Sequence, residues 1–406
     1  MDTPPPRIVT LVLVDAGGAV LGSLPPFEAE TPWWMDMAPV VRAVRARDGV
    51  RVTVLRLLET ARPFPGGAVT YLAQLDARSR PPVLRPWEGS LPDHPLRHPY
   101  ARVGGPQADL AWAGAVLAAR GAALNGEPEQ IRTWNLSSIW RLPSSLGPVW
   151  LKVVPPFFAH EGDVLAALAA LVNVPVPRLL GHEGGRILLA DIEGDDLHGA
   201  PLPQCLQMIG LLVELQKPWL GRADELTSLG LPDWRGPAFT VTIAALVRRR
   251  RGELEPVEQT LLDAFVDGLP ARFAALAACG IADGLVHGDF HPGNVRGNAQ
   301  RLTLMDWGDS GIGHPLLDQP AFLDRVPATD VPAAQAHWAA LWRQTLPLAD
   351  VERAAALLAP VASARQALIY QRFLDGIEDA EHPYHRDDVA LWLHRTAERL
   401  RAEATR

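Results

Sequence analysis

The stretch LVHGDFHPGNV, residues 285–295, is followed by MDWGDS at residues 305–310, and these two segments decide the fold of this chain. The first segment places two His, one Asp and one Asn within eight residues, around a Pro-Gly pair that predicts a tight turn. An isolated Asp in such a turn is usually only a turn former. A second Asp ends the apolar strand expected at residues 302–306, and this grouping indicates the parts of a reacting site.

The spacing of three polar residues suggests the chemistry of that site. Asp306 follows Asn294 by twelve residues, and a hairpin between them would bring the two side by side. A carboxylate beside an amide oxygen makes a hard-oxygen site that suits Mg²⁺. Asp289, five residues before Asn294, would lie nearby and could accept a proton from an alcohol. Phosphoryl transfer needs this combination, because metal ligands hold the phosphates while a carboxylate orients the nucleophile.

The segments HGDFHPGN and MDWGD resemble the catalytic and metal-binding segments of the aminoglycoside phosphotransferase family. This family of small-molecule kinases is similar in fold to protein kinases. The resemblance implies that Asp289 is the catalytic base and that Asn294 and Asp306 bind Mg²⁺. Gly288 stands where the protein-kinase loop carries an Arg, which indicates the small-molecule branch.

Further residues around the loop are expected to support it. His287 is expected to brace the loop through hydrogen bonds, since His287 and His291 lack a third ligand in sequence for a zinc site. Asp318, in GHPLLDQPAF at residues 313–322, resembles the family Asp that supports the catalytic loop from below. Asp309 follows the metal-binding Asp and is expected to add a metal ligand or a substrate contact.

A kinase also needs a Lys on a strand to hold the nucleotide phosphates and a helix Glu to orient that Lys. Lys152 lies in the predicted strand VWLKVV, residues 149–154, and Lys217 is the only other Lys of the chain. Glu161 begins the helix expected at residues 160–172. The resemblance implies that Lys152 binds the α- and β-phosphates and pairs with Glu161. The alternative for Glu161 is a charge favoured by the helix N-terminus.

Two more segments are expected to contact the nucleotide. The turn NLSS, which ends in Ser137 and Ser138, lacks a Gly-rich signature but could cover the phosphates with backbone N–H groups. The segment ILLADIEGDD looks like a hinge between two lobes. Backbone groups of Asp191 and Ile192 would then bind adenine.

The order of the expected elements predicts an α+β fold of the protein-kinase-like, bilobal type. Residues 126–196 alternate short strands with one helix and form the expected small, β-rich N-lobe. Residues 197–406 are mostly helical apart from the quoted loop and form the expected large C-lobe, with a cleft between the lobes. Residues 1–125 are expected to fold as a separate N-terminal domain of strands and helices.

This N-terminal domain resembles a Nudix-like fold in its pattern of strands, which raises a second possible activity, the hydrolysis of a nucleoside diphosphate derivative. That reaction needs a helix with clustered glutamates to hold a metal. The helix expected at residues 37–47 carries arginines instead. An accessory or substrate-capping role is therefore favoured, and three or more converging carboxylates would support the hydrolase.

Composition excludes several other classes. The 406 residues are 48% hydrophobic and 21% charged, which is typical of globular proteins. A net charge of −8 argues against nucleic-acid binding through a basic face. Two cysteines cannot form a disulfide framework or a structural zinc site. The N-terminal segment carries an Asp and three prolines, unlike a signal peptide, and no apolar run is long enough for a membrane helix. We expect a cytoplasmic protein.

The combined prediction is an ATP- and Mg²⁺-dependent phosphotransferase that transfers the γ-phosphate to a hydroxyl of a small molecule, such as an amino sugar or another metabolite. Residues 126–406 carry 25 basic and 35 acidic side chains, which suits a cationic acceptor and equally suits ordinary solubility. The sequence does not identify the acceptor. One rival is a nucleotide-binding regulator with a kinase-like fold and little catalysis. A protein kinase is disfavoured because the chain lacks the DFG and APE signatures.

Overall fold

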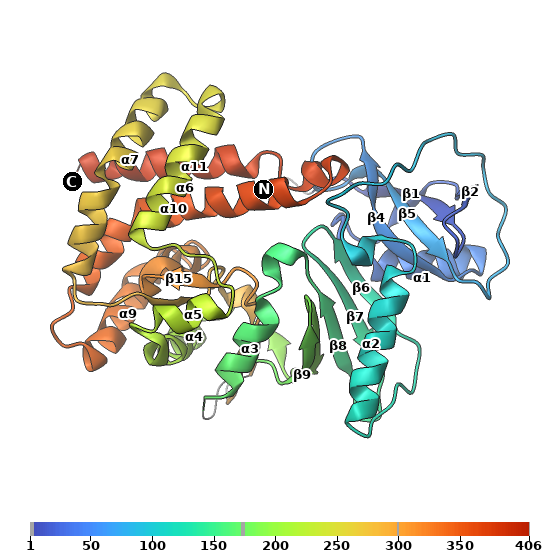
Figure 1. Cartoon of the computed structure of the whole chain (residues 1–406), viewed down its shortest axis with the longest axis horizontal. Coiled ribbons are helices and arrows are strands. Elements are labelled where there is room, and N and C mark those ends of the chain that lie inside the picture. The colour runs from blue at the N-terminus through green and yellow to red at the C-terminus, as the bar shows by residue number, and fades with distance from the viewer. Residues whose placement is uncertain (1–3, 172–174, 299, 406) are drawn as a thin grey trace. The chain divides into compact units, whose positions relative to one another are not determined.

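The computed structural model describes residues 4–171, 175–298 and 300–405 (Figure 1). The chain divides into two compact units, which are described separately below. The first unit comprises Met1–Gly162, Arg178–Asp191 and Phe373–Arg386. The second unit comprises Asp163–Pro177, Ile192–Arg372 and Asp387–Arg406.

The first unit contains two β-sheets (Figure 1). The first sheet has the order β2-β1-β5-β4 with β3 paired to β1, and its strands are β1 (Arg7–Val14), β2 (Val20–Ser23), β3 (Phe27–Ala29), β4 (Val52–Thr60) and β5 (Gly67–Leu75). The second sheet is antiparallel in the order β6-β7-β8-β10-β9, with strands β6 (Glu129–Trp134), β7 (Ser137–Leu142), β8 (Val149–Val153), β9 (Leu179–Glu183) and β10 (Arg186–Ala190). Its helical segments are α1 (Ala38–Asp48), η1 (Pro99–Ala101), α2 (Gly105–Ala119), η2 (Pro156–Phe158) and η7 (Asp379–Tyr384).

Strand β1 is buried on both faces, which explains its nearly continuous apolar sequence. Leu11 and Leu13 pack into one hydrophobic cluster, and Val12 and Val14 pack into another on the opposite face. The parallel pairing of β1 with β5 places it inside the sheet. Two backbone N–H groups of the following turn donate to Asp15 Oδ1 at 2.9 Å each. The start of the chain therefore forms a strand, a turn and a second strand.

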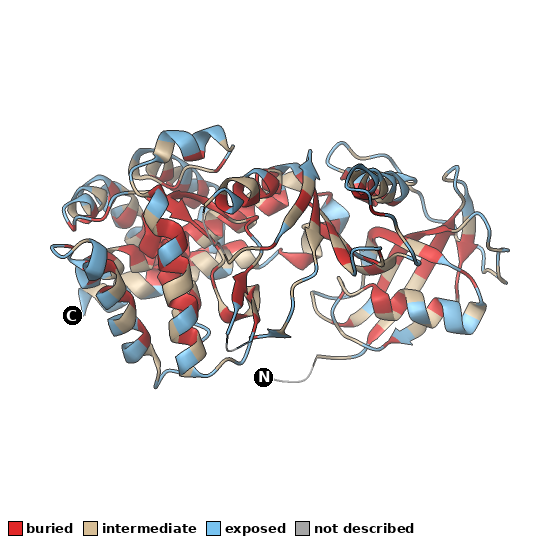
Figure 2. Ribbon diagram, turned by 90° about the horizontal axis from the view of Figure 1, so that it is seen from below, coloured by how far each residue is buried: buried red, intermediate tan, exposed pale blue. Residues whose placement is uncertain are grey.

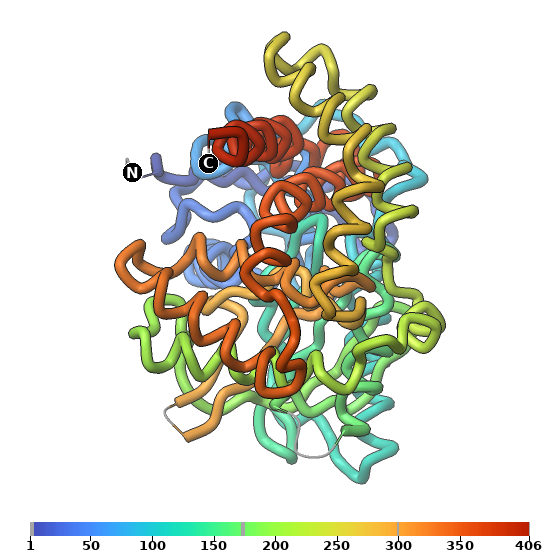
Figure 3. The backbone as a smooth tube through the Cα atoms, turned by 90° about the vertical axis from the view of Figure 1, so that its left-hand side faces the viewer, coloured from blue at the N-terminus to red at the C-terminus, as the bar shows by residue number. Residues whose placement is uncertain are grey.

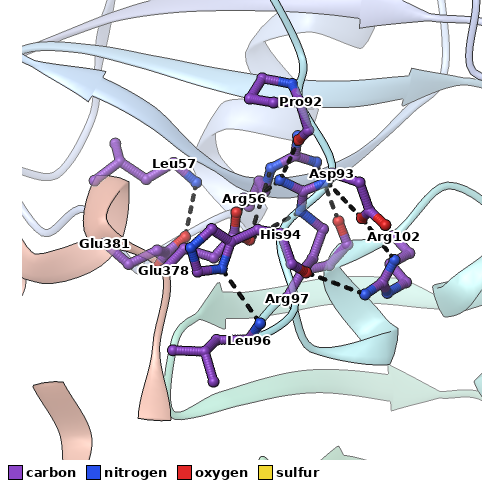
Figure 4. Close-up of polar contacts among 11 residues, drawn as sticks. Arg56, Leu57, Pro92, Asp93, His94, Leu96, Arg97, Arg102, Glu378 and Glu381 are labelled. Carbon is purple, nitrogen blue, oxygen red and sulfur yellow. Dashed lines mark hydrogen bonds and ion pairs between the residues drawn. The ribbon is translucent and has the colours of Figure 1, made fainter. Parts of the chain in front are cut away.

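Two side chains form hydrogen bonds with backbone groups on the free edge of β4. Gln130 of β6, only 3% exposed, accepts the Val54 N–H at 2.9 Å and donates to the Val54 carbonyl at 2.7 Å. Further along the edge, Glu381 of η7 accepts the Leu57 N–H at 3.1 Å (Figure 4). Unpaired strand edges carry hydrogen-bonding groups that need partners, so these contacts join the two sheets within one unit. A separate, Nudix-like N-terminal domain is thus not confirmed.

A buried ion pair accompanies that edge (Figure 4). Arg97 donates to both carboxylate oxygens of Glu378, at 2.9 and 2.7 Å, and each side chain is 10% exposed. The Arg56 guanidinium lies 3.9 Å from the same carboxylate. Bidentate pairs of this kind fix geometry as well as charge. The segment that contains η7 is therefore held firmly to β4 and to the connection before α2.

The second unit is mostly helical, as predicted. Its helical segments are α4 (Leu202–Gln216), η3 (Lys217–Trp219), α5 (Ala223–Ser228), α6 (Gly236–Arg250), η4 (Arg251–Glu253), α7 (Pro256–Ala277), η5 (Pro292–Asn294), η6 (Pro315–Asp318), α8 (Gln319–Leu323), α9 (Val331–Thr345) and α11 (Asp388–Ala404). Helix α3 (Glu161–Ala169) begins in the first unit, and α10 (Val351–Gly376) ends there. The short strands are β11 (Asp195–Asp196), β12 (Gly284–Val286), β13 (Val295–Gly297), β14 (Leu302–Leu304) and β15 (Gly311–Gly313).

The helices of the second unit bury one apolar face each (Figure 2). In α4, Cys205, Met208, Ile209 and Leu212 recur at helical spacing and are all buried. Helices α6 and α7 form a hairpin, and α11 packs against α7 (Figure 3). Among the described residues, no helix is both long and apolar enough to cross a membrane.

Candidate active site

The β13–β14 hairpin positions the predicted metal ligands. The two strands pair antiparallel, with Val295 opposite Leu304. The Met305 N–H donates to the Asn294 carbonyl at 2.8 Å, which extends the ladder by one step. Asp306 follows directly. The predicted return of Asp306 toward Asn294 therefore agrees with the register of the hairpin.

The Asn294 side chain also reaches Asp289. Its Nδ2 donates to the Asp289 carbonyl at 2.8 Å and to Asp289 Oδ2 at 3.1 Å. With both amide N–H groups directed at Asp289, the amide oxygen becomes the ligand end of the side chain. Asp306 has a φ of 61°, and it is the only non-glycine residue with positive φ in the described part of the chain. Such strained residues cluster at functional sites.

The donor set of Asn294 and Asp306 fits Mg²⁺. One amide oxygen and one carboxylate supply hard ligands, and Mg²⁺ is commonly bound by one or two such protein groups, with waters and substrate phosphates completing the octahedron. In the three described stretches, no group of three or more His, Cys, Asp or Glu residues is arranged to hold a metal ion. The two residues can therefore hold the ion only together with other oxygen donors.

The Asp289 carboxylate is kept ionised by its neighbours. His291 Nε2 lies 3.4 Å from Asp289 Oδ2, and the Asp289 side chain is 41% exposed. Burial alone would raise the pKa of Asp289, but the hydrogen bond and charge interaction with His291, together with the Asn294 hydrogen bond, hold it well below its usual range. An ionised, accessible carboxylate can accept a proton from a hydroxyl group.

The backbone before Asp289 is hydrogen-bonded to the side chain of Asp318 in η6. The Asp318 carboxylate, 1% exposed, accepts the His287 N–H at 2.8 Å and the Gly288 N–H at 2.7 Å. Gln216 Nε2 of α4 donates to it at 2.9 Å. Burial raises the pKa of Asp318, opposed by nearby positive charge and by these N–H groups. The structure thus brings the predicted supporting Asp and the catalytic loop together.

His287 connects the loop to the segment that carries Asp306. Its Nε2 lies 2.9 Å from the Met305 carbonyl, and its ring packs on Trp307 with centroids 4.6 Å apart. The side chain is fully buried, and burial lowers its pKa, which keeps the imidazole neutral at neutral pH. The bracing position predicted for His287 agrees with these contacts.

The backbone conformation of Gly288 explains why this loop has a Gly where the protein-kinase loop has an Arg. Its φ of 94° lies in the left-handed region, and a Cβ atom would lie 1.9 Å from the carbonyl oxygen of Asp309. No other residue fits there without moving that backbone. Asp309 itself lies in the turn before β15, with its carbonyl against Gly288. Its role as a metal ligand or substrate contact stays a prediction.

Lys152 and Glu161 form an ion pair in the first unit. The Lys152 Nζ lies 2.7 Å from Glu161 Oε1, and the side chains are 14% and 2% exposed. Lys152 lies on β8, between β7 and β10, where its neighbours are Ile139 and Ile187. Glu161 is the first residue of α3. The structure therefore brings together the pair that the family resemblance implies.

Ser137 and Ser138 lie in a different setting from the predicted phosphate-covering turn. They begin β7 and pair with Trp134 and Thr133 of β6. The two hydroxyl oxygens accept hydrogen bonds from tryptophan N–H groups, at 3.2 Å for Ser137 and 3.1 Å for Ser138. Both side chains are buried. A phosphate contact by these residues stays a prediction that rests on their backbone alone.

One of the boundaries between the two units falls between Asp191 and Ile192, in the segment predicted as a hinge. The Asp191 carboxylate accepts the Trp150 indole N–H at 2.6 Å. The Ile192 carbonyl accepts a hydrogen bond from Arg296 at 2.9 Å. Adenine binding at these two residues stays a prediction.

The charged face of α1 is basic, as the sequence indicated. Arg42 pairs with Glu30 and Glu129 at 3.4 Å each, and Arg45 pairs with Glu127 at 3.0 Å. These are exposed ion pairs, which contribute little to stability. No carboxylate cluster that would support the hydrolase alternative is formed by α1 and its described neighbours.

Three partners of the loop were not found from the sequence: His291, Gln216 and Arg365. His291 was visible in the motif but was considered only as a zinc ligand. Gln216 is separated from Asp318 by 102 residues, and Arg365 from its partner Gly288 by 77. No local pattern connects positions so far apart.

Comparison with known proteins identifies the family of this chain. Residues 134–357 match the model of the phosphotransferase enzyme family. A structure from Ralstonia eutropha assigned to the aminoglycoside phosphotransferases shares 18% identity, with a TM-score of 0.50 over 73% of this chain and 98% of that one. A choline kinase from Cryptosporidium parvum shares 13% identity, with a TM-score of 0.50 over 68% of this chain and 90% of that one. No curated protein shows a significant sequence match.

The family match spans more than half of the chain and includes Lys152, Asp289, Asn294 and Asp306. The similar structures share the kinase-like arrangement of a β-rich N-terminal part and a helical C-terminal part. The chain belongs to the phosphotransferase enzyme family and is a phosphotransferase of kinase-like fold.

Proposed function

We propose that this enzyme transfers the γ-phosphoryl group of ATP, bound with Mg²⁺, to a hydroxyl group of a small molecule. The observation that carries the proposal is the pair of hydrogen bonds from Asn294 to Asp289 at the end of the strand pair that leads into Asp306. These bonds link the proposed base to one of the two proposed metal ligands within one loop. Phosphoryl transfer relies on such positioning far more than on covalent chemistry.

Each residue then has a defined task. The Asp289 carboxylate orients the acceptor hydroxyl and takes its proton. The Asn294 amide oxygen and the Asp306 carboxylate hold Mg²⁺, which, when bound, neutralises charge on the transferring group. Lys152, held by Glu161, binds the α- and β-phosphates.

The surrounding residues support these tasks in the proposal. Asp318 and His287 hold the loop backbone, while Asp191 and Ile192 contribute backbone groups to the adenine site. Asp309 faces the acceptor or the metal. The two cysteines of the chain are free and buried, which fits a reducing, cytoplasmic setting.

The acceptor we propose is a cationic molecule that carries hydroxyl groups. Two structurally similar proteins are named for aminoglycosides and choline, which are acceptors of this kind. The excess of acidic side chains in residues 126–406 would raise the local concentration of a cation.

The test is turnover of ATP with Mg²⁺ against a panel of amino sugars, choline, homoserine, ketosamines and neutral sugars, with phosphorylated products identified by mass. We expect product with at least one cationic alcohol, and turnover lower by orders of magnitude with every acceptor in the Asp289→Ala variant. Turnover only with neutral acceptors would overturn the cationic class. Binding of Mg·ATP without turnover of any acceptor would instead favour the regulator.

Lys152→Met is expected to raise the KM for ATP by about 10–100-fold, because a charge-assisted hydrogen bond contributes roughly 1.5–3 kcal/mol. Lys217→Met is the matched control. Lys217 is the only other lysine, and its partner Glu214, 2.5 Å away, is exposed. Steady-state kinetics measure the KM for ATP in both variants. If Lys152→Met and Lys217→Met have the same KM for ATP, Lys152 does not bind the nucleotide.

A further inference from the structure

Arg365 of α10 is a buried cation beside the catalytic loop. Its side chain is 1% exposed, and its Nη2 donates to the Gly288 carbonyl. Gln366 Nε2 reaches the same oxygen at 3.4 Å. The Nε and Nη1 atoms of Arg365 have no hydrogen-bond partner among the described residues. Burying a guanidinium in this way costs several kcal/mol unless nearby charge offsets it.

The offsetting charges belong to the site itself. The carboxylates that act most on Arg365 are those of Asp318, Asp309 and Asp289, in that order. None of the described carboxylates forms a direct ion pair with the guanidinium, and the centroid of the Trp234 ring lies 5.9 Å from its Cζ, so its closest polar contact is the Gly288 carbonyl. A protein that needed only packing here could use an apolar side chain at much lower cost. We therefore attribute the buried charge of Arg365 to its hydrogen bond with the Gly288 carbonyl of the loop.

Gly288 is held from both sides by opposite charges. Its N–H donates to Asp318 Oδ1 at 2.7 Å, and its carbonyl accepts from Arg365. Glycine rotates more freely than any other residue, and the peptide that joins Gly288 to Asp289 sets the direction of the Asp289 side chain. Fixing both polar groups of Gly288 removes that freedom.

The same geometry excludes an arginine at residue 288. Protein-kinase loops carry an Arg between the His and the Asp, but a side chain at Gly288 would collide with the Asp309 carbonyl. A guanidinium can reach this part of the loop only from elsewhere in the chain, and α10 supplies it.

We propose that Arg365 is a positioning residue for phosphoryl transfer, which fixes the Gly288–Asp289 peptide and thereby aims the Asp289 carboxylate. The inference rests on the proposed role of Asp289. It predicts a loss in kcat rather than in nucleotide affinity, since a displacement of about 1 Å at a reacting group can lower the rate by roughly 100-fold.

The test compares Arg365→Gln and Arg365→Lys with Arg7→Gln. Arg7 is a matched control, because it is fully buried, donates to a backbone carbonyl at 3.0 Å and also has an unpartnered Nε within the described chain. It lies on β1 of the other unit. All three substitutions should lower the thermal midpoint.

Only the Arg365 variants should lower kcat per folded molecule. We expect Arg365→Gln to lose about 10–100-fold with the KM for ATP nearly unchanged, and Arg365→Lys to lose less, because an ammonium keeps the charge but not the planar fork. Hydrogen exchange of residues 287–295 should quicken in the Gln variant. Added guanidinium should restore part of the lost rate in Arg365→Ala.

The outcomes separate the two levels of the proposal. Wild-type turnover that does not depend on Asp289 would overturn the proposed function itself. Asp289-dependent turnover with kcat and loop exchange unaltered in the Arg365 variants would overturn only the positioning role. If Arg365→Gln does not fold, the Arg365→Lys variant provides the test. A folded Lys variant with the kcat and the loop hydrogen exchange of the wild type would contradict the positioning role of Arg365.

Discussion

Replacing Asp289 by Asn is expected to lower kcat by about 10²–10⁴-fold, the usual contribution of a positioned general base. The amide keeps the shape of the side chain and can still face the acceptor, but it cannot take a proton at neutral pH. The KM for ATP should change little, because Asp289 is not among the proposed nucleotide contacts. Initial rates over a range of ATP and acceptor concentrations measure both quantities.

The control for this variant is Asp324→Asn. Asp324 lies in the same unit, its side chain is 46% exposed against 41% for Asp289, and it pairs with Arg399 at 3.3 Å. It should keep the wild-type kcat. If both variants lose activity equally, the loss reflects fold stability. If neither loses activity, Asp289 is not the base, and the loop serves metal binding alone.

The approach of the proposed site residues to one another in the loop could be predicted from sequence, because they lie close together along the chain. Asn294, Asp289 and Asp306 lie within eighteen residues, and a short hairpin is the only connection needed to bring them together. The pair of Lys152 and Glu161 is nine residues apart, across one strand end and one helix start. Spacing suggested the hairpin, and the family resemblance suggested the pairing of Lys152 with Glu161.

Local boundaries were less predictable. The sequence NLSS suggested a four-residue turn, but Ser137 and Ser138 continue the ladder opposite β6 and leave only Asn135 and Leu136 in the turn. Turn residues such as Asn and Ser are compatible with both arrangements. The pairing of β6 with β7, together with the hydrogen bonds from two tryptophan N–H groups to the serine hydroxyls, favours the second arrangement.

The long-range partners could not be predicted. Arg365 is one of many arginines in a chain that has only two lysines, so its type carried no signal. Gln130 and Glu381 complete the edge of β4 from positions 76 and 324 residues away. Such contacts depend on the tertiary arrangement, and for this reason the predicted N-terminal boundary at residue 125 did not reveal how firmly the two sheets are joined.

The second prediction concerns Glu381, whose carboxylate accepts the Leu57 N–H (Figure 4). We expect the free energy of unfolding to fall as pH rises, because Glu381 is buried. Burial raises the pKa of Glu381 to about 8, from an ordinary value of 4.5; the charge of Glu378 adds to the rise, while the Leu57 N–H and Arg56 oppose it. The folded protein therefore keeps a proton that the unfolded chain releases above about pH 4.5. The contribution of Glu381 to the free energy of unfolding is fully present below about pH 4.5. It falls by roughly 5 kcal/mol in total as pH rises to about 8.

Two histidines act in the opposite direction but in another pH window. Burial lowers the pKa of His98 to about 4 and that of His314 to about 3, below the ordinary value of 6.5. The unfolded chain binds protons at these sites below about pH 6.5, so the folded protein loses stability there as pH falls. Above that pH the two histidines no longer contribute, which leaves Glu381 as the dominant buried group between about pH 6.5 and 8.

The experiment is urea unfolding of wild type and Glu381→Gln at several pH values between about 6.5 and 9. The Gln side chain imitates the protonated Glu and can still accept the Leu57 N–H, so it should be the more stable protein at the alkaline end. The difference should grow by about 2 kcal/mol from pH 6.5 to 8. Glu378→Gln is the control: it loses the Arg97 ion pair at every pH but keeps Glu381, and hence keeps the alkaline loss. Parallel pH curves for wild type and Glu381→Gln would mean that Glu381 is ionised throughout, and that the edge of β4 accepts a buried charge.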